Sequence, residues 1–381
     1  MVDWLVIGGG VAGSVVASRL GSHGATVTVV DAGPDTPTGD DLFDALEVPS
    51  RVTSVPRVHR VAGGPVVPYT AGIGLGGGSA INGSIVSTAG PFAHDHRLPM
   101  EYLGGVHRST RSGGRVNTWQ AYEPLVAATA VTTVLSTYVE HLLMENGRCV
   151  GLRTQSGDEL TAANTVVCAG ALATAPLLLR SGLAIEGLGN GIQDHPAVAL
   201  VHERTKRFGS DGPSVAALER RGPLQVMHLR RLGTADDGRA ATVVMLMRPL
   251  SRGRMWIDES GDPVISFDIG SDPADVAVLE AGVREVMSHD LRGADSAVSG
   301  AGDLSAWLRD QLATTVPVVT HAASGCAMGA VVDRFGRPRG IDGLYVVDAS
   351  VFPAVPAVNP MLPTVQLAET VVDRWIAAGL A

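Results

Sequence analysis

The sequence predicts an α/β fold in which both chain ends build one domain on a parallel sheet and a smaller antiparallel-sheet (α+β) domain lies between them. Three observations predict this arrangement. Near the N-terminus an apolar run leads into a glycine-rich turn and then into residues with helical spacing. Near the C-terminus another apolar run ends in an acidic residue followed by small ones. In the middle of the chain, apolar and polar residues alternate as in half-buried antiparallel strands.

The first 31 residues predict a Rossmann-type dinucleotide-binding unit. Residues 4–7 form an apolar strand that leads into a G-x-G-x-x-G turn at Gly8, Gly10 and Gly13. In such turns the first glycine permits a tight bend, the second lets the backbone approach a pyrophosphate and the third lets helix and strand pack. The next strand ends in Asp31, which is placed to accept hydrogen bonds from ribose hydroxyls. The motif predicts a dinucleotide and leaves FAD and NAD open.

A second glycine-rich segment follows at residues 72–83, where six of twelve residues are glycine. A flexible linker would explain the glycines, but apolar residues recur in this segment at the intervals of a core. We therefore interpret it as backbone that lies flat against a large planar ligand, because side chains there would collide with the ligand. Between Asp31 and this segment, proline-punctuated residues to about Pro68 predict irregular structure.

The remaining elements divide the chain into two domains. A buried strand over residues 165–171 and a helix behind it continue the parallel sheet, and Asn146-Gly147 predicts a hairpin. We place the nucleotide-binding domain at residues 1–196 and 314–381 and the substrate-binding domain at 197–313. The elements expected beyond residue 196 are strands at 224–229, 242–247, 264–269 and 343–350 and helices at 275–287, 304–312 and 364–378.

Composition excludes several classes of protein. The formal net charge of −9 would repel nucleic acid and anionic membrane surfaces. The three cysteines show neither a zinc pattern nor a disulfide framework, and we identify no pair of histidines at ligand spacing with a carboxylate, so we predict no metal site. The chain has no apolar run long enough for a membrane span, and its first strand leaves no room for a signal peptide. We therefore expect a cytoplasmic protein.

Seven short motifs, spread over nearly the whole chain, connect these features to a known family. They include L-G-G-G-S-A-I-N at residues 75–82, C-A-G-A with P-L-L-L-R-S-G at 168–182, and G-I-Q-D-H-P at 191–196. With the N-terminal unit, residues 249–253, residues 321–329 and the segment 343–359, they occur in family order. In these motifs the chain resembles the glucose–methanol–choline (GMC) flavin oxidoreductases. The resemblance implies FAD as the cofactor.

The resemblance also assigns roles to residues. The backbone of Gly76 and Gly77 would lie along the isoalloxazine ring, Asn82 would help to hold the cofactor, and the N–H of Met361 would face the pyrimidine edge of the flavin. The implied cofactor-binding residues are Gly8, Gly10, Gly13, Asp31, Gly76, Gly77, Ser79, Asn82, Ala169, Gly170, Asp348, Ala349 and Met361.

His321 and Asn359 are the implied catalytic pair. Oxidation of an alcohol requires removal of the hydroxyl proton and transfer of a hydride from carbon to flavin N5. A neutral imidazole can take the proton, and an amide N–H can stabilise the developing alkoxide without becoming charged. The expected partners are therefore an alcohol substrate and O₂ or another electron acceptor. Two alternatives remain open: a non-redox lyase of the hydroxynitrile lyase type, and a flavin-binding protein without turnover.

Three departures from the family pattern carry further expectations. Gly78 stands where many members have serine. Tyr69 and Thr70 stand near the position at which some members attach FAD through His or Cys, so we expect non-covalent FAD. The stretch between Gly90 and Asn117 is shorter than the family insertion that contributes a lid. We therefore expect a wide entrance and a bulky hydroxyl substrate such as a glycoside or another natural product. The alternative is that residues 197–312 or a second subunit fold over the opening.

Overall fold

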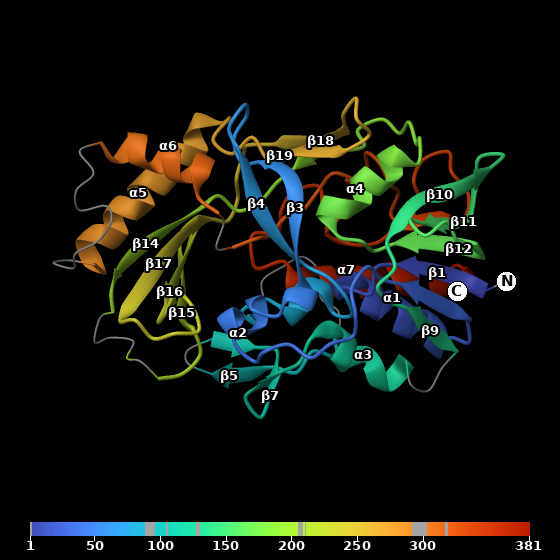
Figure 1. Ribbon diagram of the computed structural model, residues 1–381, viewed down its shortest axis with the longest axis horizontal. Helices are drawn as coiled ribbons and strands as arrows, with labels where there is room; N and C mark the ends of the chain where they lie inside the picture. Colours follow the sequence, from blue (N-terminus) through green and yellow to red (C-terminus); the bar gives the residue numbers. More distant parts are fainter. Residues whose placement is uncertain are drawn as a thin grey trace.

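The structure, a computed structural model, describes residues 2–87, 96–103, 106–126, 130–204, 209, 211–291, 303–316 and 319–381. A sheet flanked by α1 and α7 occupies one end of the molecule, together with both chain termini (Figure 1). A smaller sheet with α5 and α6 occupies the other end, and β3 and β4 run between the two. This mixed α/β architecture confirms the predicted fold class.

Five parallel strands form the core of the larger sheet, in the order β9 (Val131–Val134), β2 (Val27–Val30), β1 (Val2–Ile7), β12 (Glu159–Val167) and β20 (Leu344–Val346). The C-terminal parts of β1 and β12 are apolar and buried, as expected for strands of a parallel sheet that is covered on both faces. The pairing of β20 with β12 brings the C-terminal part of the chain into the sheet that the N-terminus begins. Both ends of the chain therefore contribute strands to one sheet.

Antiparallel strands extend this sheet at one side. β10 (Val139–Glu145) and β11 (Arg148–Thr154) pair with each other, and β11 pairs with the first part of β12. Asn146 and Gly147 connect β10 to β11 with φ of 48° and 80°, the left-handed conformation of tight hairpin turns. The structure thus confirms the predicted hairpin.

The region to about Pro68 is not irregular as predicted. It contains β3 (Val52–His59) and β4 (Val66–Gly72), which form a hairpin in a five-stranded sheet. The order of that sheet is β13 (Asn190–Ile192), β18 (Gly253–Ile257), β19 (Pro263–Ser266), β3 and β4. β3 pairs in parallel with β19, which lies about two hundred residues later in the chain. The prediction failed because this partner cannot be recognised from local proline and glycine content.

The antiparallel sheet is the main element of the inserted region. Its strands follow the order β14 (Ala197–Glu203), β17 (Arg239–Leu246), β16 (Leu224–Leu229) and β15 (Val215–Arg221). Helices α5 (Pro273–His289) and α6 (Leu304–Thr314) pack on β17 and β14. Every residue of β16 is buried, because α5 covers one face and a second apolar cluster covers the other.

The remaining elements are short or connect the sheets. They are α1 (Val11–Ser22), α2 (Leu42–Leu46), η1 (Pro49–Arg51), η2 (Gly77–Ala80), β5 (Glu101–Leu103), β6 (Val106–Arg108), β7 (Thr110–Arg111), β8 (Gly114–Arg115), α3 (Thr118–Val126), α4 (Ala171–Arg180), η3 (Ala349–Val351) and α7 (Met361–Ala377). Within the described ranges, no helix combines the length and apolarity that crossing a membrane requires.

An aromatic cluster fastens the two chain ends together. Trp4 of β1 stacks on Trp375 of α7 with ring centroids 5.0 Å apart, and Tyr345 of β20 packs edge-on against Trp375 at 5.0 Å. The indole N–H of Trp375 donates to the carbonyl of Phe335 at 2.8 Å. Trp375 therefore contacts β1 and β20, the parallel strands that come first and last in the chain.

Trp375→Ala is expected to lower the free energy of unfolding by about 3–5 kcal/mol, the usual cost of a large buried aromatic cavity. Urea denaturation of the apoprotein, followed by circular dichroism, measures the change. Tyr138→Ala is the control, because this tyrosine is 49% exposed. A loss no greater than that of the control would show that the cluster does not fasten the chain ends.

Candidate active site

The glycine turn after β1 has the geometry of a phosphate-binding site. Gly8 has a φ of 96°, and a Cβ on Gly13 would lie 1.8 Å from the carbonyl oxygen of Gly8, so strand and helix approach as closely as backbones allow. Gly10 is the N-cap of α1, no side chain caps this end, and the first turn holds no acidic residue. The free N–H groups and the helix dipole therefore leave the turn able to hold a pyrophosphate.

The second glycine segment crosses this turn in close contact. The N–H of Gly76 donates to the carbonyl of Gly9 at 2.8 Å, and a Cβ on Gly77 would lie 2.9 Å from the Cα of Gly10. Side chains at these positions would fill the space between the two segments. The bare backbone thus forms a cradle that fits a flat, phosphate-bearing ligand.

Asp31 holds the cradle together. One carboxylate oxygen accepts the N–H of Gly9 at 2.6 Å, and the other accepts the N–H groups of Gly33 and Gly74, each at 2.8 Å. The structure therefore gives Asp31 a bracing role that sequence reasoning did not identify. Its expected contact with ribose stays a prediction.

Asp348 joins two other turns at the carboxyl edge of the same sheet. Its carboxylate accepts the N–H of Gly170 at 2.8 Å, the hydroxyl of Thr174 at 2.6 Å and the N–H of Ser350 at 2.7 Å. These bonds join the turn that contains Ala169 to η3, which begins at Ala349. Burial raises the pKa of Asp348, and the hydrogen bonds oppose this shift by stabilising the carboxylate. Ligands of doubly wound sheets bind at this carboxyl edge.

Asn82 and Met361 meet beside the cradle. The amide nitrogen of Asn82 lies 3.3 Å from the sulfur of Met361, and its oxygen accepts the N–H of Ser84 at 2.8 Å and a guanidinium N–H of Arg115 at 3.0 Å. Ser79 donates to the carbonyl of Gly76 at 2.6 Å. Burial lowers the pKa of Arg115 to about 10. Sequence reasoning missed Arg115, because nothing around it in the sequence marks it as part of a site.

His321 and Asn359, predicted as a pair, lie together in the structure. The amide nitrogen of Asn359 is 3.4 Å from Nε2 of His321. On its other side, His321 places Nδ1 2.8 Å from Nδ1 of His195, and Nε2 of His195 lies 3.0 Å from the carbonyl oxygen of Pro356. Desolvation lowers the pKa of His321 well below its usual value and lowers that of His195 to about 4. Both imidazoles are therefore neutral at pH 7.

Asp194 fixes the backbone that carries both histidines. One of its oxygens accepts the N–H groups of His195 and His321, each at 2.8 Å, and the other accepts the hydroxyl of Tyr69 at 2.7 Å. Tyr69 lies on β4, and its ring is fully buried. A bridge between Gln193 and Ala323 aligns the two histidine-bearing segments. Segments more than a hundred residues apart in the sequence are thus held at one point.

A residue of the antiparallel sheet also hydrogen-bonds to Asn359. The oxygen of Asn359 accepts the hydroxyl of Ser87 at 3.0 Å and an amide N–H of Gln225 at 3.2 Å. Gln225 lies on β16 and is buried. Sequence reasoning missed both donors. For Gln225, the available signal was an amide side chain within a strand that is otherwise largely apolar.

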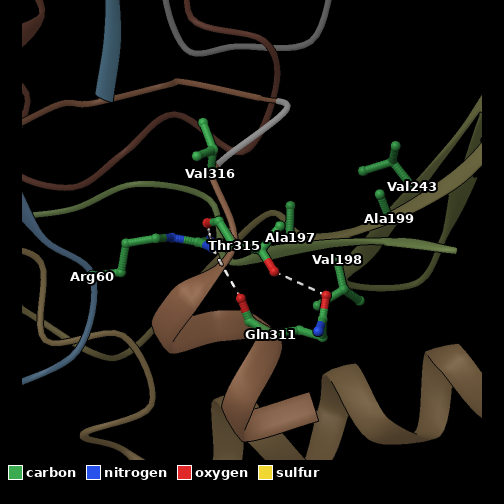
Figure 2. A pocket seen from close by; sticks show the side chains of 8 residues that line it. All are labelled: Arg60, Ala197, Val198, Ala199, Val243, Gln311, Thr315 and Val316. Carbon is green, nitrogen blue, oxygen red and sulfur yellow. Dashed lines mark hydrogen bonds between the residues drawn. The ribbon is translucent and has the colours of Figure 1, made fainter. Parts of the chain in front are cut away.

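A pocket whose lining includes neither His321 nor Asn359 lies around Arg60. It is lined by Arg60, by β14 and β17 residues and by the C-terminal end of α6, and Arg60 donates to the carbonyls of Gln311 and Thr315 (Figure 2). None of the residues that hold His321 or Asn359 lines it. We therefore assign the candidate active site to the histidine–asparagine pair and the glycine cradle.

Comparison with known families decides the assignment. GMC oxidoreductase profiles match residues 89–197 and 249–368, more than half of the chain, and an NAD(P)-binding Rossmann-like domain profile matches residues 6–40. The chain belongs to the GMC oxidoreductase family. GMC oxidoreductases are FAD-dependent, and this chain is an FAD-dependent alcohol oxidoreductase. The glycine cradle, with its uncapped helix end, fits the pyrophosphate of this cofactor.

Individual GMC relatives are moderately similar. The 5-(hydroxymethyl)furfural oxidase of Methylovorus sp. (strain MP688) is 25% identical over 529 aligned positions, which cover 97% of this chain and 98% of the relative. An oxygen-dependent choline dehydrogenase of Paraburkholderia xenovorans (strain LB400) is 26% identical over 72% of this chain and 62% of the relative. The alignment with the furfural oxidase spans more positions than the 381 residues of this chain, so this chain is shorter than that relative.

A solved structure shows the same fold. The pyridoxine 4-oxidase from Mesorbium loti superposes with a TM-score of 0.81 at 20% identity and covers 99% of both chains. The shortened chain therefore retains the fold throughout its length.

Gly10→Ala is expected to weaken FAD binding by at least about tenfold, which corresponds to about 1.4 kcal/mol. The added methyl group has only the Cα of Gly77 within 4 Å, at 3.7 Å, so the apoprotein can accept it. The methyl group would nevertheless occupy space in the cradle where we expect FAD to bind. Titration of apoprotein with FAD, read by quenching of flavin fluorescence, measures the dissociation constant. Gly233→Ala is the control, because its Cβ meets nothing within 4 Å. Wild-type FAD affinity in Gly10→Ala would contradict the assignment of the cradle.

Proposed function

We propose that this enzyme oxidises a bulky alcohol, such as a glycoside or another natural product, to the corresponding carbonyl compound. His321 is the general base and Asn359 is the hydrogen-bond donor to the substrate oxygen. The observation that carries this proposal is the placement of one acceptor, Nε2 of His321, and one donor, Nδ2 of Asn359, 3.4 Å apart. A hydroxyl group both donates and accepts, so it can bond to both atoms at once.

The residues divide the chemistry between them. Neutral His321 takes the hydroxyl proton on Nε2 as the carbon–hydrogen bond breaks. Asn359 donates to the developing alkoxide and stays neutral, and Ser87 and Gln225 keep its oxygen turned away from the substrate. Non-covalently bound FAD supplies the acceptor for the hydride that leaves the alcohol carbon. The residues expected to hold FAD are those of the cradle and its two carboxylate braces.

The proposed substrate class and electron acceptor have separate support. The relatives are named as an oxidase of a hydroxymethyl furan and as an oxygen-dependent dehydrogenase, which favours O₂ as the acceptor. The shortened chain favours a wide entrance, because less chain is present to cover the flavin. Residues 90–95 and 104–105 of the short Gly90–Asn117 stretch lie outside the described residues.

His321→Ala is expected to retain FAD and to slow flavin reduction by about 10²–10⁴-fold, the usual contribution of a positioned base. Anaerobic stopped-flow bleaching with a panel of a methyl glycoside, 5-(hydroxymethyl)furfural, methanol and choline measures this rate and ranks the substrates. Asn359→Ala should slow reduction less, because the base remains. If the flavin of His321→Ala were reduced at the wild-type rate, His321 would not be the base. If methanol or choline reduced the flavin fastest, the proposal of a bulky substrate would be rejected. If none of these alcohols bleached the flavin, alcohol oxidation itself would be rejected.

The rate of flavin reduction should also depend on pH in one direction. Since desolvation lowers the pKa of His321 from the ordinary value of 6.5, the base stays unprotonated as the pH falls to 6.5. We expect a constant rate above pH 6.5 and a decline only at more acidic pH, where His321 takes up a proton. Stopped-flow reduction from pH 5 to 9, at saturating alcohol, tests this. A rate that rises through pH 7 to 8 would contradict it.

A further inference from the structure

We propose that His195 is a positioning residue that holds His321 in the tautomer protonated on Nδ1, so that Nε2 faces Asn359 without a proton. The proposal rests on the proposed function, because it explains how His321 is kept ready as a base. His195 hydrogen-bonds to His321, not to the substrate oxygen in this proposal. It acts through the ring of its neighbour.

The chain of hydrogen bonds begins at the carbonyl of Pro356. A carbonyl oxygen only accepts hydrogen bonds, so Nε2 of His195, 3.0 Å away, must carry a proton. His195 is 1% exposed, and its ring is neutral at pH 7. A neutral imidazole has one proton, so Nδ1 of His195 must be an acceptor. The backbone carbonyls of Pro356 and Met247, which can only accept, therefore hold this ring.

The next bond transfers this constraint to His321. The two Nδ1 atoms are 2.8 Å apart, a distance that requires one proton between them. Because Nδ1 of His195 is the acceptor, that proton belongs to His321. The rings meet at an interplanar angle of 87°, which points the ring edge of one toward the other. Nε2 of neutral His321 is then left with its lone pair.

The opposite side of the site independently requires the same tautomer. Ser87 and Gln225 both donate to the oxygen of Asn359, so its amide nitrogen faces Nε2 of His321. An amide N–H can bond only to an unprotonated ring nitrogen. The other tautomer of His321 would oppose two lone pairs at the Nδ1 contact and two N–H groups at the Nε2 contact. Two chains of hydrogen bonds therefore converge on one proton arrangement.

The test uses two substitutions of nearly equal shape. In His195→Asn the side-chain oxygen can take the place of Nδ1 and accept from His321, whereas His195→Leu has the same branched shape and no acceptor. We expect His195→Asn to keep flavin reduction within about threefold of wild type and His195→Leu to lose about 10²-fold or more, since the wrong tautomer of the base in a Ser-His-Asp triad costs about 10⁴. His202→Leu is the control, because this buried histidine bonds only to Glu203 and Thr242 in its own sheet.

A second readout requires no alcohol. Holoenzyme labelled with ring-¹⁵N histidine reports the tautomer of each imidazole, and the signals absent from His321→Gln belong to His321. We expect protonated Nδ1 and unprotonated Nε2 in wild type and in His195→Asn, and a shift toward the other tautomer in His195→Leu. Protonated Nε2 in the wild type, or equal losses of rate in the Asn and Leu variants, would overturn the proposal. Protonated Nδ1 in an enzyme that no alcohol reduces would uphold it and reject the proposed function.

Discussion

The parallel pairing of β12 with both β1 and β20 is the constraint on which the rest of the structure depends. It aligns Leu5, Thr165 and Leu344, which are distant in the sequence, within one sheet. The turns that follow these three strands therefore meet at one carboxyl edge. One turn supplies the glycine cradle, one supplies Gly170, and one supplies Asp348. The C-terminal segment that carries Asn359 is fixed relative to the cradle by the same pairing.

Buried carboxylates perform the same task at three points of the site. Asp31, Asp194 and Asp348 each accept backbone N–H groups from segments that are far apart in the sequence. Burial raises the pKa of Asp194 and Asp348, so each depends on its hydrogen bonds to remain ionised. These carboxylates thus join loops that are distant in the sequence.

The antiparallel sheet contributes directly to the candidate pair. Its strand β16 brings Gln225 to Asn359, while the loop that contains Ser87 supplies a second donor to the same oxygen. A single amide is thus oriented by two segments outside the parallel sheet. The orientation of the candidate pair therefore depends on residues outside the parallel sheet, and these hydrogen bonds do not involve a long lid.

The sequence by itself determined the dinucleotide unit, both chain ends as parts of one sheet, the hairpin at Asn146-Gly147 and the nomination of His321 with Asn359. These features have local signals, because turn glycines, apolar periodicity and short motifs each depend on neighbouring residues. Only the tertiary structure decided the pairing of β3 with β19, the bracing roles of Asp31 and Asp194, and the presence of Gln225 in the site. Each of these depends on a partner distant in the sequence, and a strand or carboxylate carries no local mark of the partner it will meet.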